Sequence, residues 1–276
     1  MNQDLLYGMV LLSAVGHAVW NALLKNATDR LIMMVAIRIV GLLYGLIVLS
    51  MVEWSPIASL PWLFAAALAM WVYQGLLIQG YQAGDLSFVY PLARGIAPVL
   101  LTGLAFLSIG ESITSQQLLG VISISFGIAT LALLGRGGWS SFVYAALTGA
   151  SIASYSLLSG VGVRSSGSLL GFSAALEVAT GLGMLTYAAS TRGGSIVPSL
   201  LAIWATGLGA GTISVGGYLA FLVAVSLPIG PVSAIRECSA LFGVLIGVFV
   251  MKERFGVIRA IGAFLMTGGI ALLSLF

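Results

Sequence analysis

The chain is a succession of long apolar runs separated by short clusters of glycine, proline, serine and charged residues. The runs are close to the roughly 20 residues that an α-helix needs to cross the hydrocarbon core of a bilayer. The spans of a β-barrel would be about half as long and would alternate in polarity, and these runs do neither. The pattern predicts ten transmembrane helices, at residues 5–24, 31–52, 60–81, 86–108, 116–134, 142–162, 169–189, 200–225, 229–251 and 257–275.

Composition agrees with this pattern. Hydrophobic residues occupy 60% of the 276 positions and charged residues 7%, against roughly 45–50% and about 25% in soluble domains. So few polar side chains cannot cover a water-facing surface, and we expect an all-α integral membrane protein embedded in the lipid bilayer. The first run lacks the positive n-region of a secretory signal and is interpreted as the first span. Thr114 with Gln117 matches a capping box, which predicts the start of the fifth helix.

Charge, cysteine and motif content exclude several classes of function. The net charge of +3 is small and scattered, so we expect no nucleic-acid partner. The single cysteine, Cys238, excludes a disulfide framework, and the single histidine, His17, excludes a zinc site built on several histidines. The sequence has no Walker motif, so ATP coupling has no support. We therefore expect neither a metal nor another cofactor.

An internal repeat organises the chain. Sliding the sequence by 142 residues superposes Arg94 on Arg236 in one ungapped register. The same register aligns Pro56 with Pro198, Trp62 with Trp204, Gly75 with Gly217, Glu111 with Glu253, Gly120 with Gly262 and Gly127 with Gly269. Residues 1–137 and 138–276 then hold five helices each, and an odd number of spans inverts the second half relative to the first. Inverted repeats around a midplane site are a signature of transporters.

The distribution of basic residues predicts the orientation in the membrane. The connections after even-numbered helices carry only Arg164. The connections after odd-numbered helices carry Lys25, Arg30, Arg136, Arg192, Lys252, Arg254 and Arg259. By the positive-inside rule the odd connections are cytoplasmic, which puts both termini outside.

Five ionisable residues lie within the predicted spans, namely Arg38, Arg94, Glu177, Arg236 and Glu237. Each costs roughly 2.5–3.5 kcal/mol or more at the bilayer centre, so each should face protein or a wet cavity and have a partner. Arg38 and Glu177 occupy similar places in the second and seventh helices with opposite charge, which favours an ion pair that fixes packing. Glu237 has two interpretations, a carboxyl that takes part in proton coupling or a permanent ion pair with an arginine.

Prolines accompany both of the duplicated arginines. Pro91 and Pro98 flank Arg94, and two prolines shortly precede Arg236. A proline cannot donate to its turn of helix and obstructs the carbonyl four residues back. We therefore predict that the fourth and ninth helices are interrupted near midplane, with the arginines in the breaks and at least one reaching the cavity. An arginine there could donate to the freed carbonyls or capture a substrate carboxylate, and the sequence leaves both roles open.

Polar and aromatic side chains recur at helical spacing on several spans. His17 and Asn21 lie four residues apart with Trp20 beside them, and Ser151 and Tyr155 occupy a comparable face of the sixth helix. Such groups often only hydrogen-bond a neighbouring helix, but two facing stripes from equivalent helices favour a site. The predicted substrate-binding residues are His17, Trp20, Asn21, Gln74, Tyr90, Arg94, Ser151, Tyr155, Tyr218 and Arg236, and Ser214 is a further candidate.

Two stretches carry a family resemblance. GHAVWNALLK in the first helix and AIRECSALFGVLIGVFVMKERFG in the ninth, within a 5+5 arrangement, resemble the drug/metabolite transporter superfamily, EamA branch. Within it the chain is most similar to the YddG-type amino-acid exporters. The resemblance implies a basket of helices around a central cavity and export of amino acids or similar amphipathic metabolites. It also implies both termini inside, which disagrees with the charge count.

These observations predict a secondary transporter in the bacterial inner membrane, a monomer that exports aromatic or other amphipathic amino acids by alternating access. Carriage of drugs or nucleotide sugars is the alternative within the superfamily. An intramembrane enzyme is disfavoured, because one histidine, one cysteine and two membrane-embedded glutamates assemble no catalytic set. A membrane scaffold would not need duplicated arginines in an inverted repeat. The expected partners are a small-molecule substrate and the bilayer.

Overall fold

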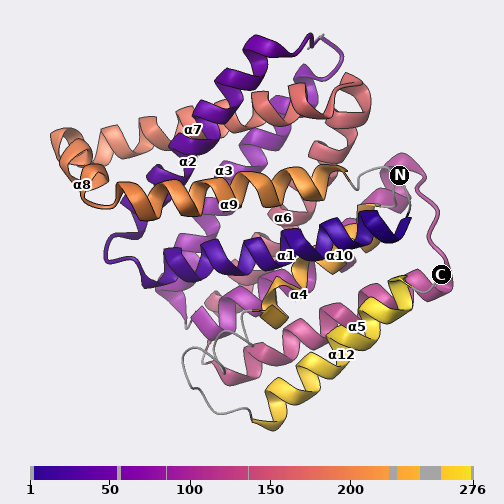
Figure 1. Cartoon of the computed structure of the whole chain (residues 1–276). Helices are drawn as coiled ribbons and strands as arrows, with labels where there is room; N and C mark the ends of the chain where they lie inside the picture. The colour runs from indigo at the N-terminus through magenta and orange to yellow at the C-terminus, as the bar shows by residue number, and fades with distance from the viewer. Residues whose placement is uncertain are drawn as a thin grey trace.

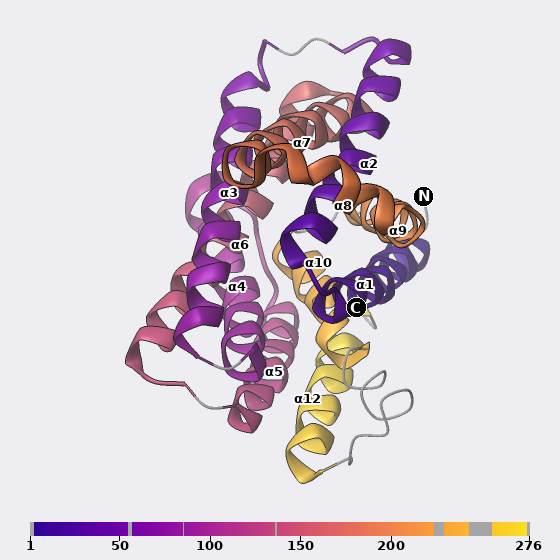
Figure 2. The same cartoon turned by 90° about the vertical axis from the view of Figure 1, so that its left-hand side faces the viewer.

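The computed structural model describes residues 3–54, 57–84, 86–135, 137–223, 229–242 and 256–274. Within these ranges the chain is almost wholly helical and contains no strand. The predicted all-α class is therefore confirmed. Figures 1 and 2 show α5 and α12 at one end of the molecule, α2 and α7 at the other, and α1, α4, α9 and α10 between them.

The helices of the first half lie where the hydropathy pattern predicts them. They are α1 (Gln3–Asn26), α2 (Arg30–Met51), α3 (Leu60–Ala83), α4 (Leu86–Ile109) and α5 (Ser115–Thr130), the last continued by the 3-10 turn η1 (Leu131–Leu134). The capping box that starts α5 is confirmed, because the Gln117 amide donates to Thr114 Oγ1 at 3.2 Å and the Thr114 amide donates to Gln117 Oε1 at 3.0 Å.

The second half departs from the predicted boundaries at two places. Its elements are α6 (Trp139–Ser166), α7 (Leu169–Arg192), η2 (Gly193–Ser195), α8 (Ile196–Ala202), α9 (Trp204–Val223), α10 (Ile229–Glu237) and α12 (Val257–Ser274). The expected connection between 189 and 200 is helical rather than irregular. The ninth predicted segment, 229–251, is described only to residue 242, and α10 ends at a turn formed by Cys238.

The predicted interruption of the fourth helix is wrong. α4 runs without a break through Pro91 and Pro98. Each proline removes only one backbone hydrogen bond. Packing of α4 against α5, α6 and α10 supports the helix along its length and outweighs the local preference of the prolines.

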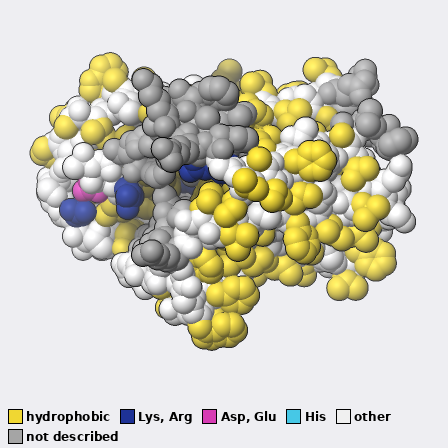
Figure 3. Space-filling model, turned by 90° about the horizontal axis from the view of Figure 1, so that it is seen from below, with side chains coloured by type: hydrophobic (Ala, Val, Ile, Leu, Met, Phe, Trp, Pro, Cys, Tyr) yellow, Lys and Arg dark blue, Asp and Glu magenta, His cyan; other side chains and the backbone are white. Residues whose placement is uncertain are grey.

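Seven helical segments are long and apolar enough to cross a membrane among the residues described, the first Leu5–Leu24 and the last Leu169–Ala202. Large apolar side chains such as Phe64, Leu107 and Phe126 are exposed on their surfaces. Figure 3 shows charged side chains gathered near the centre and one end of one face, with apolar side chains over much of the remainder. An apolar exterior of this kind suits lipid and not water, so the chain is a multi-pass membrane protein. The count of ten spans stays a prediction.

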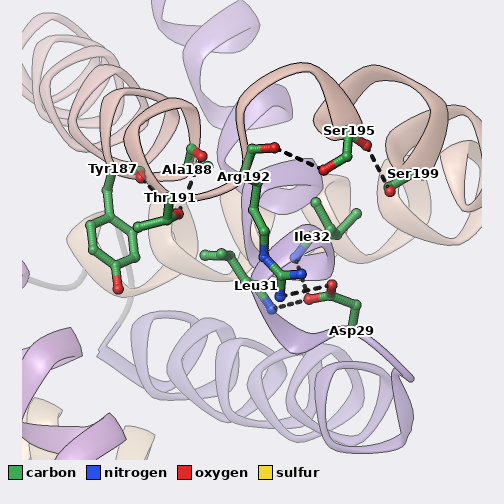
Figure 4. Close-up of polar contacts among 9 residues, drawn as sticks. All are labelled: Asp29, Leu31, Ile32, Tyr187, Ala188, Thr191, Arg192, Ser195 and Ser199. Carbon is green, nitrogen blue, oxygen red and sulfur yellow. Dashed lines mark hydrogen bonds and ion pairs between the residues drawn. The ribbon is translucent and has the colours of Figure 1, made fainter.

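Two ion pairs near helix ends are consistent with spans that alternate in direction. At the end of α7, Arg192 Nη2 lies 3.1 Å from the carboxylate of Asp29, which also caps the start of α2 (Figure 4). At the other pair, Arg164 Nη2 lies 3.0 Å from Glu111 Oε1. Asp29 and Arg192 both belong to odd predicted connections, and Glu111 and Arg164 both belong to even ones.

Close glycine crossings hold two antiparallel helix pairs together. Between α5 and α12, a Cβ on Gly127 would lie 2.8 Å from the Gly262 carbonyl oxygen, and a Cβ on Gly262 would lie 2.8 Å from that of Gly127. Gly120 and Gly269 approach each other in the same reciprocal way, at 3.1 and 2.7 Å. Small residues let backbones come this close, which is how helices associate tightly in lipid.

The crossing of α2 with α7 repeats this arrangement. A Cβ on Gly181 would lie 3.0 Å from the Arg38 carbonyl oxygen, and one on Gly45 would overlap the carbonyl of Ala174. Elsewhere α1 packs on α9 and α3 packs on α6.

Candidate functional site

A cavity lies at the meeting point of eight helices, α1, α2, α3, α4, α6, α7, α9 and α10. The lining residues are Ser13, His17, Trp20, Arg38, Met70, Tyr73, Arg94, Tyr155, Glu177, Ser214, Gly217, Tyr218 and Arg236. Aromatic walls interrupted by a few convergent polar groups are typical of small-molecule sites.

Most of the residues singled out in the sequence lie on this cavity. Six of the ten predicted binding residues line it, namely His17, Trp20, Arg94, Tyr155, Tyr218 and Arg236. Arg38, Glu177 and Ser214 join them. The structure therefore brings together residues that are up to 219 positions apart in the chain, from His17 to Arg236. Their role in binding a solute stays a prediction.

Four predicted binding residues, Asn21, Gln74, Tyr90 and Ser151, are not part of the cavity wall. Asn21 turns back within α1 and donates to the His17 carbonyl at 2.7 Å. Tyr90 supports a lining residue from one side, with its ring centroid 5.2 Å from Arg94 Cζ. Helical spacing identifies a face only to within about one residue, because successive side chains point roughly 100° apart.

Four residues line the cavity that were not predicted from the sequence, namely Ser13, Met70, Tyr73 and Gly217. Ser13 lies one turn before His17 on the same face of α1. Extending the polar stripe of this helix by one turn would therefore have predicted it. Its hydroxyl donates to the Gly217 carbonyl at 2.5 Å and ties α1 to α9. Tyr73 is the neighbour of the predicted Gln74. Met70 carries no polar group that could have distinguished it from packing residues.

Arg94 is held in a buried polar cluster that joins three helices. Its Nη1 lies 2.5 Å from Glu237 Oε2 on α10, and its Nη2 lies 2.6 Å from His17 Nε2 on α1. An arginine can only donate, so the histidine Nε2 must accept and the neutral ring carries its proton on Nδ1. Of the two interpretations of Glu237, this geometry favours the ion pair, because the carboxylate is 1% exposed and does not line the cavity.

The predicted ion pair between the second and seventh helices is confirmed. Arg38 Nη1 lies 3.3 Å from Glu177 Oε2, and both side chains line the cavity. Gly41 makes room for the carboxylate, because a Cβ at this position would overlap Glu177 Oε2. The pair therefore contributes to the packing of α2 on α7 and to the polarity of the cavity wall.

Arg236 has a different environment. It is 6% exposed, and no carboxylate among the described residues lies within ion-pair distance of it. Its Cζ lies 4.4 Å from the ring centroid of Phe221 and 6.0 Å from that of Tyr218. Attraction to aromatic faces stabilises a guanidinium without neutralising its charge. Arg236 is thus a buried cation that faces both aromatic rings and the cavity.

The end of α10 positions Arg236 beside an irregular turn. The Cys238 amide donates to the Ile235 carbonyl at 3.1 Å, and the Leu241 amide donates to the Cys238 carbonyl at 2.8 Å, both with the tighter three-residue spacing. The ninth predicted segment is therefore interrupted next to its arginine, but the break lies seven residues after Pro231 and not at the proline. The last turn of a helix also favours a cation, because its carbonyl groups point toward it.

Comparison with known proteins supports the fold and names no function. No protein-family model and no curated protein matches the chain. Among solved structures 28 chains match. One, described only as a crystal structure of a protein, aligns with 99% of this chain and 96% of its own length at a TM-score of 0.73 and 15% identity. At that identity the likeness shows the fold alone, which extends over nearly the whole of both chains.

Proposed function

We propose that this protein is a secondary transporter that exports amino acids or similar amphipathic metabolites by alternating access. The observation that carries the proposal is that helices of both predicted halves form the cavity wall. In the predicted repeat α1, α2, α3 and α4 correspond to α6, α7, α9 and α10, and each of these eight helices contributes to the wall. A site at the interface of two inverted halves opens to alternate sides when one half rocks against the other.

The glycine crossings support the inverted repeat. In the register of 142 residues Gly120 corresponds to Gly262 and Gly127 to Gly269. The observed contacts are Gly120 with Gly269 and Gly127 with Gly262, so exchanging the two halves converts each contact into the other. Self-complementary contacts of this kind are the mark of a two-fold relationship. The packing of α1 on α9 and of α6 on α3 has the same reciprocity.

The cavity wall supports an amphipathic solute. Trp20, Tyr73, Tyr155 and Tyr218 offer aromatic surface to an apolar body, and the polar groups beside them are guanidinium, carboxylate and hydroxyl groups. We expect the protein to act as a monomer in a bacterial inner membrane, without a cofactor. Carriage of drugs or nucleotide sugars is the second candidate, favoured by the same aromatic walls.

Counterflow in proteoliposomes tests the proposal. Vesicles loaded with one unlabelled amino acid should take up the labelled one transiently, and Ser214→Phe, which fills the cavity, should abolish this uptake. Leu107→Phe is the matched control, because Leu107 is 81% exposed on the lipid-facing side of α4. Absence of counterflow with every amino acid, together with counterflow of a nucleotide sugar, would overturn the amino-acid assignment.

A further inference from the structure

The buried charges around the cavity do not balance. The three arginines of the cavity wall, Arg38, Arg94 and Arg236, face two buried carboxylates in the described part of the chain. Glu177 pairs with Arg38 and Glu237 pairs with Arg94, while His17 accepts a hydrogen bond and is neutral. One positive charge remains, on Arg236.

The structure does not describe the side chains of three further acidic residues, Asp4, Asp85 and Glu253. In sequence they stand at predicted span ends or connections, where we expect water to solvate a carboxylate. Glu237 is the direct neighbour of Arg236 in sequence, but successive helical residues point about 100° apart, and its carboxylate is bound to Arg94 instead.

The guanidinium of Arg236 keeps its donors available. An aromatic ring at 4.4 Å from Cζ interacts with a guanidinium through its ring face. The N–H groups lie in the guanidinium plane, as a fork that matches the two oxygens of a carboxylate. No hydrogen bond joins this fork to another residue of the described ranges, and the side chain lines the cavity.

We infer that Arg236 anchors a carboxylate of the transported solute, and that the site takes monocarboxylates with an apolar, preferably aromatic body. The inference rests on the proposed transport function and narrows its substrate class. Arg94 and Arg38 are not the anchors, because Glu237 and Glu177 already occupy them. A single negative charge neutralises the surplus on Arg236, whereas a zwitterion brings no net charge. An ammonium group on the solute is therefore dispensable.

Three probes with the same benzene body separate the two charged groups of an amino acid. They are 3-phenylpropionate, which has only the carboxylate, L-phenylalanine, which has both groups, and phenethylamine, which has only the ammonium. The measurement is the melting temperature of the purified protein against probe concentration, since a ligand of the folded state raises it. We expect the first two to raise the melting temperature and phenethylamine to leave it unchanged. Stabilisation by phenethylamine alone, or by none of the probes, overturns the inference.

Variants of Arg236 test the anchor itself. In Arg236→Gln we expect 3-phenylpropionate to bind about 30-fold more weakly or worse, as for loss of one partner of a buried charge pair. Arg236→Lys, which keeps the charge and loses the fork, should fall between the two. Arg192→Gln is the matched control, because this arginine is 46% exposed and pairs with Asp29 away from the cavity. Equal affinity in all four proteins overturns the inference.

Stability without ligand distinguishes an anchor from a structural residue. Arg236 has no carboxylate partner among the described residues, so Arg236→Gln leaves no such charge unpaired and loses only the contacts with the Phe221 and Tyr218 rings. It should therefore melt at most slightly below the wild type. A variant that melts far lower, or fails to fold, assigns Arg236 to a structural pair and overturns the inference. Binding through Arg236 without any counterflow would instead reject transport and leave the anchor standing. Counterflow that is insensitive to Arg236→Gln and Arg236→Lys would reject the anchor and leave transport standing.

Discussion

Arg94 on α4 and Glu237 on α10 form an ion pair at 2.5 Å, between predicted spans that are equivalent in the two halves. Arg94 and Arg236 occupy the same position of the predicted repeat, but the residue that follows is Gly95 in the first half and Glu237 in the second. Glu237, in the second half, therefore forms its ion pair with Arg94, in the first half. This asymmetry neutralises one duplicated arginine and leaves the second free to face the cavity.

The first prediction concerns the stability of this pair. Arg94→Gln and Glu237→Gln should each lower the free energy of unfolding by about 3–5 kcal/mol, because each leaves one buried charge without its partner. The double variant should be more stable than either single variant, since no charge is left over. Denaturant unfolding in detergent micelles measures all three. Arg192→Gln, which breaks the more exposed pair with Asp29, should cost no more than about 1 kcal/mol.

The outcome against this prediction would be additive losses in the double variant. Additivity would mean that the two side chains stabilise the fold independently, and the observed pair would then contribute nothing of its own.

The second prediction concerns proton coupling through Glu237. The carboxylate is bound to Arg94 and is absent from the cavity wall, so we expect it to act as a permanent ion pair. The Arg94→Gln/Glu237→Gln variant should keep the wild-type shape of the pH profile of counterflow, whatever its absolute rate. Counterflow measured from mildly acidic to mildly basic buffer checks this. A profile that becomes flat would restore the coupling role.

The third prediction concerns the glycine crossing of α5 with α12. A Cβ on Gly269 would lie 2.7 Å from the Gly120 carbonyl oxygen and 3.0 Å from the Ile124 amide nitrogen. Because these are backbone atoms of the facing helix, Gly269→Ala should destabilise the protein by about 1–3 kcal/mol. Gly268→Ala is the adjacent control, with nothing within 4 Å of its Cβ, and should be neutral or stabilising by up to about 1 kcal/mol. Equal melting temperatures for the two variants would contradict the crossing.

The fourth prediction concerns orientation, for which the charge count and the family resemblance disagree. The chain has one cysteine, Cys238, so a Cys238→Ser background carries no thiol. In it we expect Ile57→Cys to react with an impermeant maleimide on intact cells and Arg192→Cys to react only in inside-out vesicles. Both side chains are well exposed, and they belong to even and odd predicted connections respectively. The reverse pattern would put both termini inside.

The sequence by itself determined the class of protein and most of the helix boundaries. Both follow from local properties, because apolar runs of membrane length and a cap such as Thr114 act over neighbouring residues only. It also identified Arg38, Arg94, Glu177 and Arg236 as residues that need a partner or a wet cavity. A charged residue in an apolar span is costly wherever that span lies in the fold. The ion pair of Arg38 with Glu177 could be predicted because the two residues face each other from equivalent helices with opposite charge.

Only the tertiary structure decided how the remaining groups pair and face. Glu237 adjoins Arg236 in sequence but binds Arg94, because the rotation and crossing of α10 against α4 set the direction of each side chain. The rotation of α3 likewise decides that Tyr73 lines the cavity and Gln74 does not. Successive side chains of a helix point in different directions, so a shift of one residue moves a side chain out of the cavity wall. The continuity of α4 through two prolines depends on the helices packed around it. Contacts between residues far apart in the chain, which no local pattern contains, determined these three outcomes.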